Sequence, residues 1–386
     1  MAVNSFRSDG LNQPELTFGQ KLTSLNWLLV LLITMIAAVG FLMLYSAANG
    51  DVYPWAVRHA VRYGVCLLVM VTIAMVDIRF WIKSAYIGYA LVLALLLLVE
   101  VMGEIGMGAQ RWIDLGVVQL QPSELMKIAL VLALARFFHG FSYEEVGNPL
   151  NLLVPLLLIA LPAVLVLRQP DLGTALMMLA GSGAIFFLAG VRIWKFMLVI
   201  AAGLGAIPIA WQFLRGYQKQ RILTFLDPES DPLGSGYHIL QSKIALGSGG
   251  MFGKGFLKGS QSHLNFLPEK QTDFIFTMLA EEFGMVGGLA MLGLYVLTIG
   301  YGFAIAIRCR SQFGRLVAMG VTTTLFLYLF INVAMVMGLI PVVGVPLPLI
   351  SYGGTAMLTM MIGLGLLLGV SIHRDVRIAR SGVDEE

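Results

Sequence analysis

The chain has 386 residues, of which 58% are hydrophobic and only 12% are charged. Soluble domains are less apolar and carry about twice that charged fraction, so this composition excludes a soluble globular protein. The formal net charge of +3 excludes no class, because the distribution of Lys and Arg in a membrane protein matters more than their sum. Apolar runs of about 20 residues recur along the chain, each long enough to cross a membrane as a helix. The sequence therefore predicts an all-α polytopic integral membrane protein.

A polar tail over residues 1–24 precedes the first apolar run. That run contains YSAA at residues 45–48, which resembles a signal-peptide cleavage site. Its apolar core, however, exceeds the roughly 7 to 15 residues of a secretory signal. We therefore expect a retained first helix and no removed targeting segment.

The hydrophobic pattern predicts a single membrane domain over residues 25–373 with about ten spanning helices. The spans are expected at residues 25–47, 58–76, 84–102, 124–139, 151–168, 172–190, 195–214, 274–307, 316–340 and 352–373. Pro155, Pro162 and Pro170 interrupt the pattern around the fourth to sixth spans. Proline is tolerated at such depth when neighbouring helices satisfy the freed backbone groups.

Basic residues indicate the orientation of these spans, since Lys and Arg accumulate in cytoplasmic segments. The segments on the side of the N-terminus carry most of them, namely Arg7, Lys21, Arg79, Lys83, Arg136, Arg192, Lys195, Arg308, Arg310, Arg315, Arg374, Arg377 and Arg380. The short opposite segments carry only Arg58, Arg62, Arg111 and Arg168. Both termini, including a tail over residues 374–386, are therefore predicted to be cytoplasmic.

One long polar segment, residues 215–273, is predicted on the outer side between the seventh and eighth spans. Loops of this length are usually functional or disordered, and the composition argues against disorder. Within it, Tyr237, Leu240 and Ile244 share one helical face, while His238, Gln241 and Ser242 lie elsewhere. Residues 237–246 are therefore expected to form an amphipathic helix on the membrane surface.

The same segment contains GSGGMFGKG at residues 247–255, which superficially resembles a phosphate-binding loop. Ser248 stands where that motif requires its first glycine, Gly255 stands where it requires Ser or Thr, and no strand precedes it. A nucleotide site is therefore excluded. The glycines are expected to form tight turns and to allow close backbone approach, with exposure of amides to an anionic ligand as the alternative.

A charged pair occurs near the outer end of the fourth span, in QPSELMKIAL at residues 121–130. Glu124 and Lys127 are three residues apart, so they share one side of a helix. Charged side chains at that depth usually face a cavity or each other. The pair is therefore either the wall of a polar pocket or an intramembrane ion pair that locks helix packing, and the spacing does not choose between them.

Two further charged residues are predicted on the same outer side. Arg111, in GAQRWIDLG, could bind a phosphate through two parallel hydrogen bonds. Asp171 follows Pro170 in RQPD at the start of a predicted span. A carboxylate in that position is favoured as a helix N-terminal residue, so capping is the preferred interpretation of Asp171.

Asp273, in FLPEKQTDFIF at residues 266–276, is the last polar residue before the eighth span. Thr272 or Asp273 is the residue type expected at a helix N-cap, and from the residues alone capping is as plausible as catalysis. Glu281 and Glu282 follow about 12 Å deeper along the helix. A doublet of carboxylates in an apolar run must be partnered or neutral, so it indicates a polar interior.

Near the last span, PVVGVPLPLISYGGTAM combines three prolines and two adjacent glycines around Ser351 and Tyr352. Such irregular backbone is allowed at this depth only where it is buried in protein or lines an aqueous cavity. Four outer segments are therefore expected to converge on one polar chamber. Cys66 falls inside an apolar run and Cys309 in a basic loop, and metal-ligand spacing is absent, so neither a disulfide nor a metal site is predicted.

Together, DPESDPLGSGYHILQSKIALGSGG, FLPEKQTDFIF, LAEEFG and PVVGVPLPLISYGG resemble the SEDS family, from the first span to the last. The sequences DPESDPLG and SQSHLNFLPE favour the elongation branch of this family over its division branch. The resemblance implies a peptidoglycan glycosyltransferase of the bacterial inner membrane that polymerises lipid II into glycan strands on the periplasmic side. It also implies a class B penicillin-binding protein and other elongation-complex membrane proteins as partners, and no nucleic acid.

The resemblance further implies that Asp273 is catalytic, and that Glu124, Lys127 and Ser351 are cavity residues whose loss impairs function. Family members often carry His where Gln271 stands, so no imidazole role is expected here. Arg111, Arg221, Lys127 or a divalent cation such as Mg²⁺ is expected to compensate the diphosphate of the substrate. Other interpretations are a lipid II flippase, or a scaffold that recruits cell-wall enzymes without catalysis.

Overall fold

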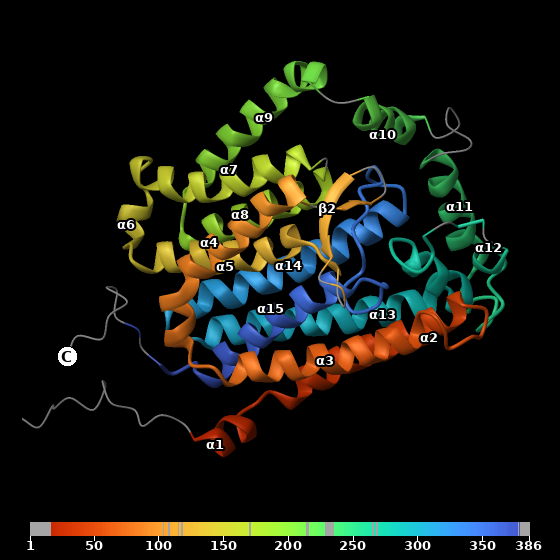
Figure 1. Cartoon of the computed structure of the whole chain (residues 1–386), viewed down its shortest axis with the longest axis horizontal. Helices are drawn as coiled ribbons and strands as arrows, with labels where there is room; N and C mark the ends of the chain where they lie inside the picture. The colour runs from red at the N-terminus through yellow and green to blue at the C-terminus, as the bar shows by residue number, and fades with distance from the viewer. Residues whose placement is uncertain are drawn as a thin grey trace, which may run out of the picture.

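The computed structural model describes residues 17–102, 104–106, 109–114, 116, 119–169, 171–213, 216–227, 235–264, 266–267, 269–376 and 378. The described residues include ten long helices, which pack into an elongated bundle except for α9, which projects from it (Figure 1). They are α2 (Trp27–Ala47), α3 (Ala56–Met75), α4 (Ile78–Met102), α5 (Pro122–His139), α7 (Leu153–Arg168), α8 (Leu172–Ala189), α9 (Ile193–Phe213), α13 (Ile275–Arg308), α14 (Gln312–Val336) and α15 (Gly354–Ile372). The prediction of an all-α polytopic membrane protein is confirmed.

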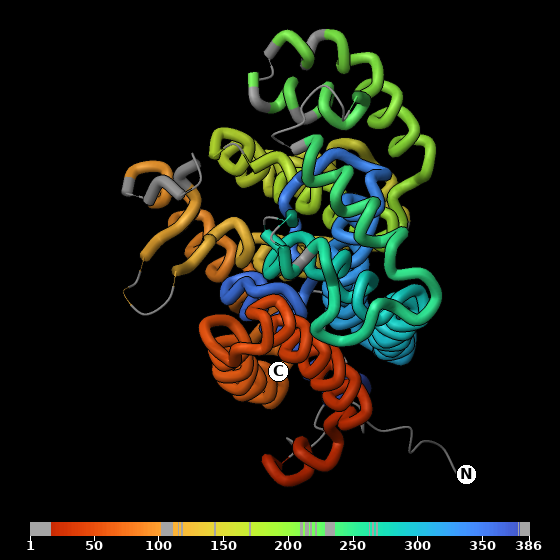
Figure 2. Tube along the Cα trace, turned by 90° about the vertical axis from the view of Figure 1, so that its right-hand side faces the viewer, coloured from red at the N-terminus to blue at the C-terminus, as the bar shows by residue number. Residues whose placement is uncertain are grey.

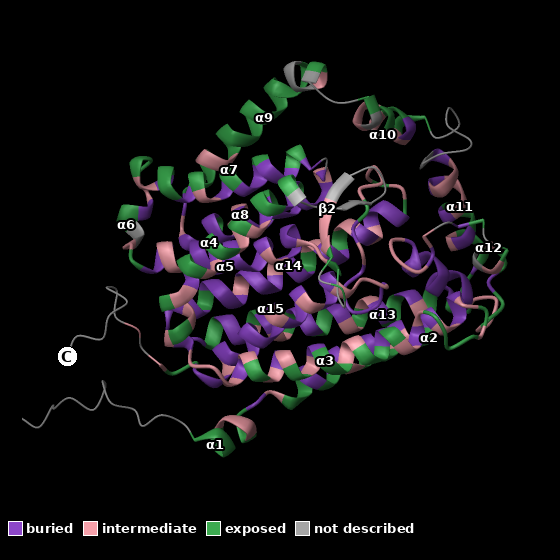
Figure 3. Ribbon diagram, in the orientation of Figure 1, coloured by how far each residue is buried: buried purple, intermediate pink, exposed green. Residues whose placement is uncertain are grey.

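Eight helices in the described part of the chain are long and apolar enough to cross a membrane. The other two predicted spans correspond to α5, which carries Glu124, Lys127 and Arg136, and to α9, whose apolar stretch is Ile193–Pro208. Charge in α5 lowers its mean hydropathy. It is nevertheless among the most buried helices, because other helices surround it (Figure 3).

Shorter elements connect the long helices. They are α1 (Phe18–Thr23), α6 (Tyr143–Val146), η1 (Leu150–Leu152), α10 (Gly216–Leu226), α11 (Ser235–Ser248) and α12 (Ser260–His263). Between α4 and α5 the chain forms a small antiparallel sheet of β1 (Glu104–Gly106), β2 (Ala109–Asp114) and β3 (Gln119–Leu120). The hydropathy pattern did not predict this sheet, because its strands are short and lie in a polar connection.

The two ends of the bundle differ. At one end, the Lys21 ammonium donates to the Met75 carbonyl at 2.9 Å, and the Arg310 amide donates to the Arg374 carbonyl at 2.9 Å. The His373 Nε2 atom lies 3.9 Å from the Asp77 carboxylate, two residues after Met75, so the first and last described segments lie at the same end. The segment that carries α11 and α12 lies at the opposite end, over the ends of other helices (Figure 2).

The first turns of α13 are separated from the rest of the helix by a break at Gly284, whose φ is 65°. The glycine loop over residues 247–255 packs against this break. The amides of Lys254 and Gly255 donate to the carbonyls of Glu281 and Glu282, each at 3.0 Å, and the Met285 amide donates to the Gly250 carbonyl at 2.9 Å. The loop therefore satisfies backbone groups that the break releases. Close backbone approach is confirmed for Gly249 and Gly253, where a Cβ atom would lie 2.1 Å and 2.0 Å from a carbonyl oxygen of α13, and the amides of Lys254 and Gly255 are used internally.

The carboxylates of Glu281 and Glu282 are fully buried at the same break. Glu281 accepts from the Lys254 ammonium at 2.7 Å and from the Gln261 amide at 3.0 Å. Glu282 accepts from the Ser46 hydroxyl at 2.5 Å, and the Nε2 atom of His263 lies 3.2 Å from it. Both carboxylates are partnered, as predicted, and they attach the segment around α12 to α2 and α13.

The predicted surface helix exists as α11, and its side that packs against the bundle differs from the apolar face of Tyr237, Leu240 and Ile244. Ile239 and Ser242 are buried against the bundle, whereas Ile244 is 51% exposed. The Ser242 hydroxyl donates to the Val336 carbonyl at 2.8 Å and bonds the Thr277 hydroxyl at 2.9 Å. The face of α11 that docks is therefore lined by Ile239, Ser242 and Ala245, two of which are small enough to allow close approach, and part of its apolar face remains exposed.

Replacing Gly253 tests how far the fold depends on the glycine loop. A Cβ atom at this position would lie 2.0 Å from the Glu282 carbonyl oxygen, and φ is +80°. We expect Gly253→Ala to destabilise the purified protein by roughly 3 kcal/mol or more, because the clash would push the glycine loop away from the break in α13. Gly250→Ala is the matched control, with φ +54° but no atom within 4 Å. It should cost only about 1–2 kcal/mol. Equal losses of thermal stability for the two variants would contradict this account.

Candidate functional site

Asp273 lies in the turn that leads into α13, at the end of the bundle that carries α11 and α12. The N-cap of α13 is Phe274, whose side chain makes no capping hydrogen bond. The Thr272 hydroxyl instead contacts Glu269, at 2.9 Å from its carboxylate. The interpretation of Thr272 or Asp273 as the N-cap is therefore wrong, since the helix begins later than the polar pattern indicates. Asp273 is partly exposed.

Three consecutive carbonyl groups hold the backbone at Asp273. The Tyr352 amide donates to the Gln271 carbonyl at 2.8 Å, and the Ser351 hydroxyl donates to the Thr272 carbonyl at 2.6 Å. The Asn332 side-chain amide donates to the Asp273 carbonyl at 2.9 Å. The donors come from α14 and from the segment before α15. The turn is therefore fixed by two elements far from it in sequence.

The segment over residues 341–352 is irregular, as predicted, and much of it is buried in protein. Ser351 is 3% exposed, and its hydroxyl also accepts from the Leu347 amide at 2.8 Å. The described contacts thus make Ser351 a positioning residue for the turn at Asp273. Gly344 faces Asp273, because a Cβ atom there would lie 3.4 Å from the Asp273 Oδ2 atom.

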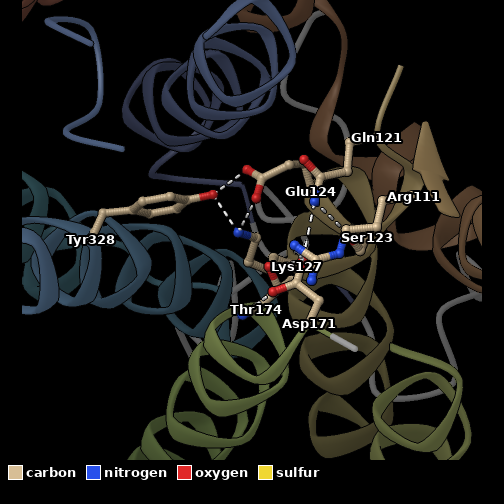
Figure 4. A network of polar contacts seen from close by, with 8 residues as sticks. All are labelled: Arg111, Gln121, Ser123, Glu124, Lys127, Asp171, Thr174 and Tyr328. Carbon is tan, nitrogen blue, oxygen red and sulfur yellow. Dashed lines mark hydrogen bonds and ion pairs between the residues drawn. The ribbon is translucent and has the colours of Figure 1, made fainter. Parts of the chain in front are cut away.

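Glu124 and Lys127 form a buried ion pair of 2.6 Å in the first turns of α5 (Figure 4). Their side chains are 6% and 3% exposed. The Tyr328 hydroxyl, from α14, contacts both of them, as donor to Glu124 and as acceptor from Lys127. This geometry supports the interpretation as an ion pair that locks helix packing. The pair lies in the low-dielectric interior, where each charge needs the other.

Asp171 caps α8, as the preferred interpretation predicts. Its carboxylate accepts from the Thr174 amide at 3.1 Å and from the Thr174 hydroxyl at 2.9 Å, and Gln121 donates to it at 3.2 Å. Arg111, on β2, lies 3.9 Å from Asp171 and donates to the Gln169 carbonyl at 3.0 Å (Figure 4). The Arg111 side chain is still 28% exposed.

These segments meet at one end of the bundle. The Thr355 hydroxyl, at the start of α15, donates to the Gln119 carbonyl on β3 at 2.8 Å. A Cβ atom at Gly173, beside Asp171, would lie 2.8 Å from the Val343 carbonyl oxygen. The 341–352 segment therefore reaches from the Asp273 turn to the Asp171 cap. In the described residues the outer segments therefore meet as predicted, while the polar chamber between them stays a prediction.

Arg221 was also among the predicted site residues. It lies in α10, next to α11, and its side chain falls outside the described residues. Figure 1 shows α10 apart from the helices that hold Asp273.

Three residues near the site were not among the predicted site residues. Tyr328 and Asn332 are four residues apart on α14, so they lie on one face, one turn apart. Arg62 stacks on the Tyr352 ring, with its guanidinium carbon 4.6 Å from the ring centre. A polar residue within an apolar run is the signal that points to Asn332.

Next to the turn at Asp273, burial lowers the pKa of the Lys270 ammonium.

Metal ligands do not gather at the site in the described part of the chain. Nowhere among these residues do three or more His, Cys, Asp or Glu side chains come close enough to hold a metal ion. The polar groups that do converge are carboxylates paired with cations, amides and hydroxyls. They can position a substrate and exchange protons with it.

Comparisons with known proteins agree with this arrangement. The family model of FtsW, RodA and SpoVE, described as "Cell cycle protein", matches residues 23–376. The peptidoglycan glycosyltransferase MrdB of Escherichia coli K12 is 44% identical over 94% of this chain and 97% of its own length. Stage V sporulation protein E of Bacillus subtilis is 36% identical over 91% of this chain and 98% of its own length.

Solved structures share the fold. A chain from a structure described as "Structural coordination of polymerization and crosslinking by a peptidoglycan synthase complex" superposes with a TM-score of 0.78 and 35% identity, covering 91% of this chain and 98% of that one. The rod shape determining protein RodA of Thermus thermophilus gives a TM-score of 0.69 and 33% identity, with coverage of 91% and 97%. This chain therefore belongs to the FtsW, RodA and SpoVE family, which is the SEDS family that its motifs resemble.

Proposed function

We propose that this protein is a peptidoglycan glycosyltransferase that polymerises lipid II during cell elongation, with Asp273 as the general base. The names of its relatives support the enzyme class. One observation supports the choice of residue. Glu124 and Asp171, the other site carboxylates, are buried and bonded to Lys127 and Thr174, whereas Asp273 is partly exposed on a fixed turn. A general base must come within hydrogen-bond reach of the proton that it removes.

The reaction that fits needs one base. Asp273 takes the proton from the 4-hydroxyl of the acceptor sugar as that oxygen attacks the anomeric carbon of the donor. The bond from this carbon to the undecaprenyl diphosphate breaks, the diphosphate leaves with the electron pair, and the anomeric centre inverts through an oxocarbenium-like state. A diphosphate is already a good leaving group. A general acid, which glycosidases require, is therefore unnecessary here.

Arg111 is the best supported partner for the diphosphate among the predicted residues. Its guanidinium is partly exposed at the site, and arginine can bind phosphate oxygens in pairs. Lys127 is a weaker candidate than the sequence suggested, because its ammonium is buried against Glu124 and Tyr328. A divalent cation such as Mg²⁺ would enter with the diphosphate of the substrate.

The substrate explains the proposed location, in the inner membrane with the site on the periplasmic face. Its polyprenyl tail must stay in lipid while its head group reacts in water. The Asp273 end lies opposite the end that carries described basic residues of the predicted cytoplasmic segments, such as Lys21, Arg310 and Arg374. Ile244 of α11 is exposed and could contact the tail.

The partner proposed for this chain is a class B penicillin-binding protein, which would crosslink the new strands beside other elongation-complex proteins. The related structure described as a peptidoglycan synthase complex supports a partner of this kind. An identity of 44% to MrdB, against 34% to FtsW of Coxiella burnetii, favours elongation over division. Polymerisation by the purified protein, compared with lipid II translocation in liposomes, distinguishes the enzyme from a flippase and from a scaffold.

Asp273→Asn is expected to abolish polymerisation. The amide keeps the size of the side chain but cannot accept the proton, so labelled lipid II supplied with the penicillin-binding partner should yield no polymer above background. Glu269→Gln is the matched control, since it makes the same change four residues away in the same segment and should polymerise normally. Polymer made by Asp273→Asn at the normal rate would rule out the base assignment.

Lys127→Met is expected to destabilise the protein by about 3–5 kcal/mol, because it leaves the Glu124 carboxylate buried without its cation. The double variant Glu124→Gln/Lys127→Met removes both charges and should recover most of the lost stability. Thermal unfolding of the purified variants in detergent measures both effects. A Lys127→Met protein as stable as the wild type would show that the pair does not lock the packing.

Asn332→Ala removes the donor that holds the Asp273 and Val345 carbonyls. We expect a stability loss of about 1–3 kcal/mol and a fall in polymerisation rate at temperatures where the variant is fully folded, because the Asp273 turn loosens. Thr359→Ala, which removes another buried polar side chain away from this turn, is the control. An unchanged rate in folded Asn332→Ala would show that the other two bonds suffice.

A further inference from the structure

A groove lies beside the second half of α13, at the end of the bundle opposite Asp273. Its volume is about 560 Å³, and α13, the N-cap of α2 and the C-terminal end of α15 line it. The groove has an apolar wall along α13 and basic residues at one end. None of its residues belongs to the candidate site described above.

The apolar wall matches one leaflet of a membrane in length. Leu297, Gly300 and Ala304 lie along the wall, and Arg308 follows at its end. From Leu297 to Arg308 the helix rises by roughly 16 Å, about half of the ~30 Å hydrocarbon thickness. Leu297 is 54% exposed, so this wall faces lipid. An acyl chain from one leaflet would therefore cover it.

The end of the groove is positively charged. Arg308 and Arg374 both line it and both are exposed. Asp375 lies 3.5 Å from Arg374 and also 3.5 Å from Arg310, so one carboxylate is shared between two guanidinium groups. Across the described residues, Arg308 forms no ion pair.

Asn26 adds a polar group at the same place. Its side-chain oxygen caps α2 by accepting from the Leu29 amide at 3.2 Å. Its amide nitrogen makes no hydrogen bond to any described residue, so it can donate to a ligand. Two guanidinium groups and an amide form a donor set suited to a phosphate.

We propose that this groove binds one anionic phospholipid of the inner leaflet, with its phosphate between Arg308 and Arg374 and an acyl chain along α13. Basic pockets between spanning helices on the cytoplasmic side bind anionic head groups. Such a lipid would tie together α2, α13 and α15, which are far apart in sequence. The site is separate from the proposed glycosyl transfer.

Native mass spectrometry of the full-length protein in detergent tests this proposal. Phosphatidylglycerol and phosphatidylethanolamine are added separately, and the lipid retained by each variant is measured. The wild type should retain one phosphatidylglycerol in preference to phosphatidylethanolamine. Arg308→Gln/Arg374→Gln should lower the apparent affinity for phosphatidylglycerol by about 30-fold, from two cationic contacts.

The matched control is Lys83→Gln/Arg192→Gln, which removes two exposed charges from the same end but outside the groove. It should bind the lipid as the wild type does. Gly300→Leu keeps every charge and fills the groove, and it has room to fold because no atom lies within 4 Å of a Cβ there. It should also weaken binding.

Three results would overturn the proposal: equal retention of the two lipids by the wild type, equal losses in the double variant and its control, or normal binding by the double variant. Copurification of the penicillin-binding partner that depends on Arg308 and Arg374, with lipid binding unchanged, would likewise overturn it and assign the groove to a protein contact. Thermal midpoints confirm that each variant is folded before it is compared.

Discussion

The candidate site depends on one constraint, which is that a polar group carried into an apolar bundle must find its partner inside the protein. α14 meets this constraint twice on a single face. Tyr328 contacts both members of the Glu124–Lys127 pair, and one turn later Asn332 donates to the Asp273 and Val345 carbonyls. Because both contacts come from the same helix face, the ion pair and the turn at Asp273 are positioned relative to each other. A shift of α14 would disturb both.

The same constraint explains the glycine loop. A break in a helix releases backbone groups, and in this protein a distant loop binds several of them. The buried carboxylates Glu281 and Glu282 then attach the residues around α12 to the broken helix. The first turns of α13, which Asp273 precedes, are therefore held from two sides. The 341–352 segment contacts one side and the glycine loop contacts the other. The backbone that carries the Asp273 carboxylate is therefore fixed, although it lies in a turn.

Much of the fold could be predicted from the sequence, because hydropathy reports directly on spanning helices. All ten predicted spans overlap a long helix, including α5, whose charges lower its hydropathy. Local sequence patterns were less reliable where tertiary contacts determine the start of a helix or the face that it packs. The N-cap of α13 falls at Phe274 because donors from α14 and the 341–352 segment fix the preceding turn. The docking face of α11 contains Ser242 because small residues allow close approach, and no periodicity within one helix reveals what lies opposite.

The residue types of the candidate site could be predicted from the sequence, but the role of each residue could not. The spacing of Glu124 and Lys127 left a pocket wall and an ion pair equally open, and only the Tyr328 hydroxyl on α14 distinguishes them. Ser351 was expected at a cavity, yet its hydroxyl bonds two backbone groups.

This arrangement has a physical reason, since a buried charge that left its partner to bind a substrate would leave the other charge buried and unpaired. The buried residues are therefore better suited to fixing geometry. The partly exposed Asp273 and Arg111 lie where a sugar head group can reach them while its lipid tail stays in the membrane.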